Sequence, residues 1–82
     1  MAKTNITVKS NLNTIIKASY IHMKEIESRT VGTGIKISEL RTLKDRIEGT
    51  LSVIEHTGQY IEELSLLLSI KREIYSILQK FI

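Results

Sequence analysis

The amino-acid sequence predicts an all-α fold, a small helical bundle or helical hairpin. From Leu40 onward every seventh residue is apolar, and this period keeps one stripe of a helix directed at a neighbouring helix. These heptad positions are Leu40, Ile47, Ile54, Ile61, Leu68, Tyr75 and Ile82. The sequence also has no proline and only four glycines. Small strand-rich domains generally need more turn residues, so we expect helices joined by short loops.

Residues 1–10 are polar, and we expect them to form a flexible N-terminal arm. The remainder, residues 11–82, is short enough to form a single helical domain. Ile6 and Val8 alternate within the arm, as Ile35 and Ile37 do further along the chain. A brief two-stranded ribbon between these pairs is the alternative, although such a ribbon is barely stable alone.

The first helix is expected over residues 11–28. Ser10 or Asn11 suits its N-cap, because a short polar side chain can accept a hydrogen bond from a free backbone N–H. The residues that follow on one face at helical spacing are Leu12, Ile15, Ile16, Ser19, Tyr20, Met23 and Ile26. The stripe ends near Ser28 and leaves Ile21 on the opposite face.

Gly32 and Gly34 predict a loop after the first helix, since glycine readily adopts positive φ. Ser38 then suits an N-cap, and Glu39 lies in the first turn, where the helix dipole favours an acid. The apolar seam that follows consists of Leu40, Leu43, Ile47, Leu51 and Ile54. The second helix is therefore expected over residues 38–56.

Gly58 decides whether the last two helices are separate. Glycine weakens a helix interior and suits a C-terminal cap, so a break here predicts a third helix over residues 59–81. The heptad keeps its phase through Gly58, however, which favours one continuous helix over residues 38–81. Such a helix would be about 66 Å long and would need a partner from another chain. We favour the break and keep the continuous helix as the alternative.

The third helix has the broadest apolar surface. Its main stripe consists of Tyr60, Ile61, Leu64, Leu67, Leu68, Ile74, Tyr75, Leu78 and Phe81, and Ile70 and Ile77 extend it sideways. Apolar residues over more than half of a helix surface indicate contacts on two sides. Lys71 lies within the stripe, where it can specify an oligomer or simply reach out to water.

The short chain of 82 residues favours self-association. A domain of this size buries only roughly 60–65% of its unfolded surface, so it generally needs disulfides, a metal or oligomerisation. The sequence has no cysteine and only two histidines, His22 and His56. We expect no metal and no cofactor, and we expect a homodimer or a complex with another protein.

We expect no enzyme activity. A general base needs an orienting group and an acid or nucleophile in the same pocket, and the residues near His22 and His56 do not supply both. Gly32 and Gly34 lack the further glycines of a phosphate-binding fingerprint.

Nucleic-acid binding is the alternative function. Residues 1–46 contain nine Lys or Arg and four acidic residues, a balance of +5, whereas residues 47–82 contain three and five, a balance of −2. A small basic transcriptional regulator would use the cations near the start of the second helix. These residues are Lys36, Arg41, Lys44 and Arg46.

The preferred function is a non-enzymatic regulatory protein that binds another protein through an apolar helix face. Some apolar residues lie outside the stripes that are expected to pack within the chain, and we expect these to bind the partner. They are Ile21, Leu66, Ile70 and Ile77. A phage- or plasmid-type regulator that restrains a host, membrane or lysis protein fits this composition. No apolar stretch is long enough to cross a bilayer and residues 1–10 are not a signal peptide, so we expect a cytoplasmic protein.

Overall fold

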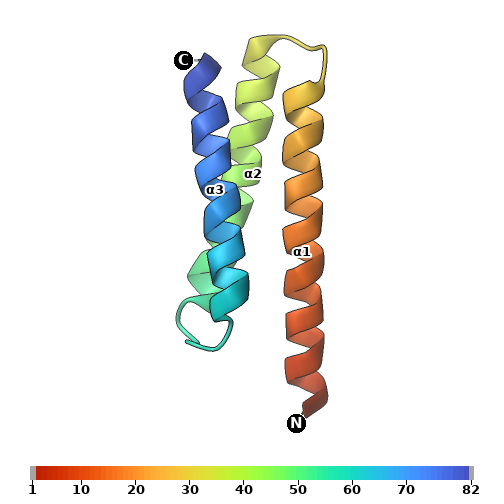
Figure 1. Ribbon diagram of the computed structural model, residues 1–82, viewed down its shortest axis with the longest axis vertical. Helices are drawn as coiled ribbons and strands as arrows, with labels where there is room; N and C mark the ends of the chain where they lie inside the picture. Colours follow the sequence, from red (N-terminus) through yellow and green to blue (C-terminus); the bar gives the residue numbers. More distant parts are fainter. Residues whose placement is uncertain (1, 82) are drawn as a thin grey trace.

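The computed structural model describes residues 2–81, and of residues 2–7 it describes the backbone only. Its three helices are α1 (Ala2–Ser28), α2 (Thr33–Ile54) and α3 (Ile61–Phe81). Each helix packs against the other two, and α2 runs opposite to α1 and α3 (Figure 1). The described residues contain no strand. The prediction of a small all-α bundle is therefore confirmed.

Both of the first two helices begin earlier than the sequence predicts. α1 begins at Ala2 rather than residue 11, because residues 2–10 lack glycine and proline and because Val8 continues the apolar stripe one turn before Leu12. α2 begins at Thr33, after an N-cap at Gly32, and Ser38 lies within the helix. Ile37 packs against the core one turn before Leu40, so the apolar seam again extends past the predicted cap.

The last two helices are separate and are joined by a loop that contains Gly58. This confirms the preferred prediction of a break over the alternative of one continuous helix. Gly58 has φ +67°, a conformation that a side chain disfavours. Just before it, the Thr57 hydroxyl donates to the Ile54 carbonyl at 2.7 Å, and this bond satisfies a backbone oxygen at the end of α2. α3 then begins at Ile61, two residues later than predicted.

The core is one apolar cluster along the bundle axis. Its buried members are Leu12, Ile16, Met23, Ile26, Leu40, Leu43, Ile47, Leu51, Ile54, Leu67, Ile70, Ile74, Ile77 and Leu78. Ser19 and Glu63 are buried beside them. Glu63 lies in the first turn of α3, where a carboxylate is favoured by the helix dipole. Burial of this many large aliphatic side chains is the main stabilising term of the fold.

The heptad register does not describe the core of α3. Leu40, Ile47 and Ile54 are buried in α2, but Ile61, Leu68 and Tyr75 are exposed in α3 by 70%, 40% and 45%. The buried stripe of α3 is displaced by one residue and runs through Leu67, Ile70, Ile74 and Ile77. The constant phase through Gly58 is therefore a property of the sequence and not of the packing.

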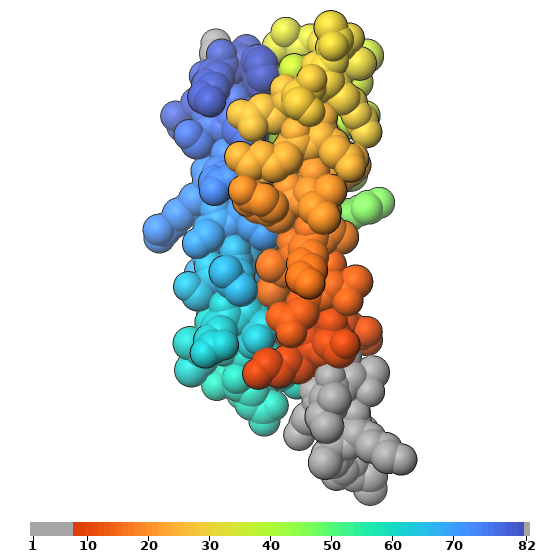
Figure 2. Space-filling model, turned by 45° about the vertical axis from the view of Figure 1, so that its right-hand side comes forward, coloured from red at the N-terminus to blue at the C-terminus, as the bar shows by residue number. Residues whose placement is uncertain are grey.

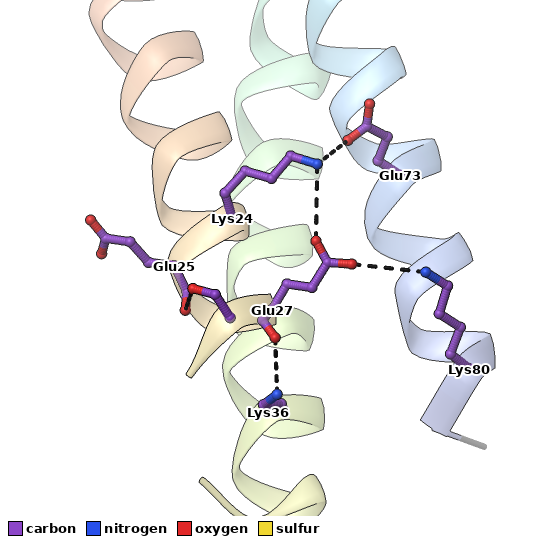
Figure 3. A network of polar contacts seen from close by, with 7 residues as sticks. Lys24, Glu25, Glu27, Lys36, Glu73 and Lys80 are labelled. Atoms are coloured by element: carbon purple, nitrogen blue, oxygen red, sulfur yellow. Dashed lines mark hydrogen bonds and ion pairs between the residues drawn. The ribbon is translucent and has the colours of Figure 1, made fainter. Parts of the chain in front are cut away.

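A polar network joins the C-terminal end of α1 to the other helices (Figure 3). The Glu27 carboxylate lies 3.9 Å from the Lys24 Nζ and 3.8 Å from the Lys80 Nζ of α3. Lys24 also lies 3.9 Å from Glu73 of α3. The Lys36 Nζ of α2 donates to the Glu27 backbone carbonyl at 2.9 Å. This last bond satisfies a free carbonyl in the final turn of α1 and anchors the loop between α1 and α2.

The bundle is elongated, with extents of 47 × 19 × 15 Å. The N-terminal end of α1 extends beyond the loop that joins α2 to α3 (Figure 1). Among residues 2–81, none of the helices has the length and apolar composition needed to cross a bilayer.

Candidate protein-binding site

The four residues predicted to bind a partner fall into two groups. Ile21 and Leu66 are 56% and 51% exposed, as expected of residues outside the intrachain stripes. Ile70 and Ile77 are each only 5% exposed, so the prediction that they lie outside the core and are free to bind a partner is wrong. They face inward because α3 packs against both α1 and α2, and the middle of its broad stripe lies at these positions.

Three of the four residues nevertheless meet at one place, a groove between α1 and α3. This α1–α3 groove has a volume of about 400 Å³. Its lining residues are Ile16, Lys17, Tyr20, Ile21, Leu66, Ser69, Ile70 and Glu73. Ile77 is not among them. Figure 2 shows this side of the molecule, where the orange segment of α1 borders the blue segment of α3.

The α1–α3 groove has an apolar floor and exposed apolar walls. Ile16 and Ile70 are buried beneath it, whereas Tyr20, Ile21 and Leu66 are about half exposed. Tyr20 also lies under the Lys24 ammonium, whose Nζ is 5.5 Å from the ring centroid. Aromatic side chains are enriched at protein interfaces, and here one lies beside two exposed aliphatic side chains.

Tyr20 is the wall residue that sequence reasoning missed. The helical spacing placed it with Leu12 and Ile16 in the core stripe, but its ring lies at the edge of that stripe and 45% of the residue is exposed. Ile15 is also more exposed than its place in that stripe implied. The signal that could have separated Tyr20 is its hydroxyl, since a tyrosine commonly keeps its polar end in water.

A second groove lies on the other side of α1, against α2. It has a volume of about 660 Å³, and Ala18, Ser19, Gly49 and Thr50 line it, together with Ile15, His22, Leu43, Arg46, Ile47 and Val53. The small side chains explain the larger volume of this α1–α2 groove. Among the exposed residues that line it, Ile15 and Val53 are large and apolar.

The cations of the alternative, nucleic-acid function differ in their contacts within the fold. The Lys36 Nζ donates to the Glu27 carbonyl and lies 5.6 Å from the Phe81 ring centroid. The Lys44 Nζ lies 3.6 Å from Glu48 and 4.9 Å from the Tyr75 ring centroid. Arg41 and Arg46 are exposed, and Arg46 lines the α1–α2 groove. Two of the four cations therefore have partners within the fold.

Lys71 also has an intrachain partner. Its side chain is 29% exposed, and its Nζ lies 3.9 Å from the Glu48 carboxylate of α2. The ammonium therefore reaches the edge of the bundle, in agreement with the second of the two sequence-based interpretations.

The fold and the surface together define a class, a small three-helix bundle in which grooves flank the first helix. Comparison of this chain with protein-family models, with curated proteins and with solved structures finds no match. Within the described part of the chain, no three His, Cys, Asp or Glu side chains gather as metal ligands. The arrangement of the α1–α3 groove suits the burial of apolar side chains from another polypeptide.

Proposed function

We propose that this protein is a non-enzymatic interaction module that binds another polypeptide through the α1–α3 groove. The observation that carries the proposal is the exposure of Tyr20, Ile21 and Leu66 around the buried floor of Ile16 and Ile70. Large apolar side chains that gather at one place on a small protein are typical of an interaction surface. A protein that covers a partner in this way would act as a regulator, because the covered surface is no longer free for other contacts.

The energetics require an interface larger than the groove alone. Burying the exposed half of one aliphatic side chain contributes about 1 kcal/mol. The three wall side chains, two aliphatic and one aromatic, together contribute less than the 4 to 15 kcal/mol, roughly, that association costs in lost freedom. A partner must therefore also contact the surfaces of α1 and α3 beyond the groove, in addition to the polar lining residues Lys17, Ser69 and Glu73.

Site-specific photo-cross-linking in the native host tests this proposal. A photoreactive phenylalanine analogue at position 66 is expected to form a discrete polypeptide adduct. The matched control is the same analogue at position 61, because Ile61 is also exposed on α3 but does not line the groove. The Ile21→Glu substitution is expected to abolish the adduct at position 66, since it places a charge in the apolar wall.

Two outcomes would contradict the proposal. One is the absence of any adduct at position 66. The other is an adduct of equal yield at positions 61 and 66 that Ile21→Glu does not reduce.

A further inference from the structure

We propose that the occupant of the α1–α3 groove is a second copy of this chain, related by a two-fold axis parallel to the helices. This inference rests on the proposed function and names the partner. In such a dimer, α1 of one subunit lies across from α3 of the other subunit, and the same surface is used twice. Three observations carry it: the separation of charge on the surface, the direction of the helices and the placement of Tyr20 and Leu66.

Opposite charges lie on the two sides of the α1–α3 groove. Lys17 lines it on α1, and Lys9 and Lys24 lie two turns before and after Lys17 at helical spacing. On the α3 side the lining residues are Leu66, Ser69, Ile70 and Glu73, and Glu62 precedes Leu66 by one turn. Some of these charges already pair within the chain: Lys24 lies 3.9 Å from both Glu73 and Glu27, and Lys80 of the α3 edge lies 3.8 Å from Glu27. With these pairs included, the α1 edge (Lys9, Lys17, Lys24 and Glu27) still has an excess of positive charge, and the α3 edge (Glu62, Glu73 and Lys80) has an excess of negative charge.

This charge pattern distinguishes between the two ways in which identical surfaces can meet. An axis perpendicular to the helices would place α1 against α1 and α3 against α3. Lys17 of one subunit would then approach Lys24 of the other, and of the edge charges named above only Glu62 and Lys80 would meet as an opposite pair. An axis parallel to the helices places the lysines of α1 against the serines and glutamates of α3. Like charges across an interface are unfavourable and opposite charges are favourable, so the parallel axis is selected.

The intrachain contacts show which residues of α1 and α3 lie at the same position along the bundle axis, and therefore which would meet across the dimer. α1 and α3 run in the same direction, and the pairs Lys24–Glu73 and Glu27–Lys80 show that a residue of α1 lies level with one about 50 positions later. Rotation about a parallel two-fold axis leaves the position of each residue along the bundle axis unchanged. It therefore brings Lys9 of one subunit level with Glu62 of the other, and Tyr20 level with Ser69 and Ile70, one turn after Leu66.

The apolar residues would then pack reciprocally. Tyr20 of each subunit packs over the groove of the other, between Leu66 and Ile70, and Ile21 flanks this contact on the outer side of α1. The two grooves close over each other, so the half-exposed wall residues become the centre of a continuous apolar interface. Lys9 and Glu62 lie at its rim.

The size of the surface is small for a stable dimer. α3 has 21 residues and is about 32 Å long, and the bundle is 19 Å across, which gives a projected area of roughly 600 Å². Standard interfaces bury about 800 Å² per partner, so we expect a weak dimer with a Kd on the order of 10 μM.

Sedimentation equilibrium on the whole chain tests the dimer and its orientation. The wild-type protein is expected to dimerise at micromolar concentration. Lys9→Glu and Glu62→Lys are each expected to weaken the dimer about tenfold, since each creates two repulsive pairs per dimer. Arg41→Glu is the matched control, because it makes the same charge change on exposed α2 and should leave the Kd unchanged.

Mixing the two charge variants gives the decisive measurement. Lys9→Glu and Glu62→Lys are expected to form a heterodimer tighter than either variant with itself, because both pairs across its interface are again opposite in charge. If the substitutions acted only within their own subunits, without contact between positions 9 and 62 across the interface, the variants would show no preference for each other. A fluorescently labelled variant titrated with the unlabelled one would report it.

The proposal is overturned if the wild-type protein is monomeric at about 1 mM, well above the expected Kd. It is also overturned if a dimer forms but the mixed charge variants show no preference for each other. A monomeric protein that still gives a groove-dependent adduct with a different polypeptide would reject the second copy and keep the proposed function. A monomer without any such adduct would reject both.

Discussion

Leu66 and Ile70 lie one turn apart on α3, and the packing gives them different environments. Ile70 is buried against the core beneath the α1–α3 groove, whereas Leu66 stands at its wall with half of its surface exposed. Ile70 therefore contributes to folding, and Leu66 remains free to contribute to binding. The distinction follows from position on the helix surface, since both are large aliphatic residues.

Alanine substitutions should separate these two contributions. Ile70→Ala leaves a cavity in the core and is expected to lower the free energy of unfolding by about 3 kcal/mol. Leu66→Ala removes a half-exposed side chain and should lower it by less than about 1 kcal/mol. Urea denaturation followed by circular dichroism, at concentrations below the expected Kd, measures both. Equal losses for the two variants would contradict the assignment of Leu66 to the surface.

Among the secondary-structure elements, two glycines differ in backbone conformation: one lies in a loop with positive φ and the other lies inside a helix. Gly58 has φ +67° in the loop between α2 and α3. Gly49 lies within α2 in a helical conformation, and a Cβ atom built there meets nothing within 4 Å. The same substitution is therefore expected to have opposite effects on stability at the two positions.

Gly58→Ala is expected to destabilise the protein by about 1 kcal/mol, because a Cβ atom disfavours positive φ. Gly49→Ala is expected to stabilise it by about 0.5 to 1 kcal/mol, since alanine loses less backbone freedom in a helix. Thermal unfolding of the two variants in parallel provides the measurement. A stabilising Gly58→Ala would show that α2 and α3 join as one continuous helix, in contradiction to the loop.

At the scale of the whole molecule, the bundle is longer than a compact chain of its size. Its radius of gyration is 14.0 Å over the Cα atoms, whereas a compact domain of 82 residues has a value of about 12 Å. The cause is the arrangement of three long helices side by side, which leaves a narrow cross-section of 19 × 15 Å. In such a shape each helix has only two neighbours and keeps an outer face exposed.

Small-angle X-ray scattering checks this shape. Extrapolated to infinite dilution, where the monomer dominates, the radius of gyration is expected to be close to 14.0 Å, increased slightly by side chains and hydration. The longest dimension should be near 47 Å. A dimension above about 66 Å would instead indicate the continuous helix over residues 38–81.

Much of the fold can be predicted from local patterns. The apolar spacing that begins at Leu12 and Leu40 predicts helices, because a helix aligns residues three and four apart whatever surrounds it. Gly58 predicts the break, because positive φ favours glycine. The starts of α1 and α2 were placed too late, because Ser10 and Ser38 suit a cap but do not require one when apolar packing continues beyond them.

The candidate site was predicted in part. Ile21 and Leu66 could be recognised because they lie away from the centre of any apolar stripe. Ile70 could not be distinguished from Leu68, since apolar residues cover more than half of α3 and either could face inward. The rotation of α3 about its own axis decides between them, and no local signal in the sequence specifies that rotation.

Helical segments, a preferred break at Gly58 and an apolar surplus on the last helix can be predicted from the chain alone, because they depend on interactions between residues close in sequence. The break itself, and the part of the surplus that is covered, follow from the packing of the helices. This packing buries Ile70 and Ile77, exposes Ile61, Leu68 and Tyr75, and brings Ile21 and Leu66 to one groove. The physical reason is that α3 must pack against α1 and α2 at once, and this joint packing fixes its orientation.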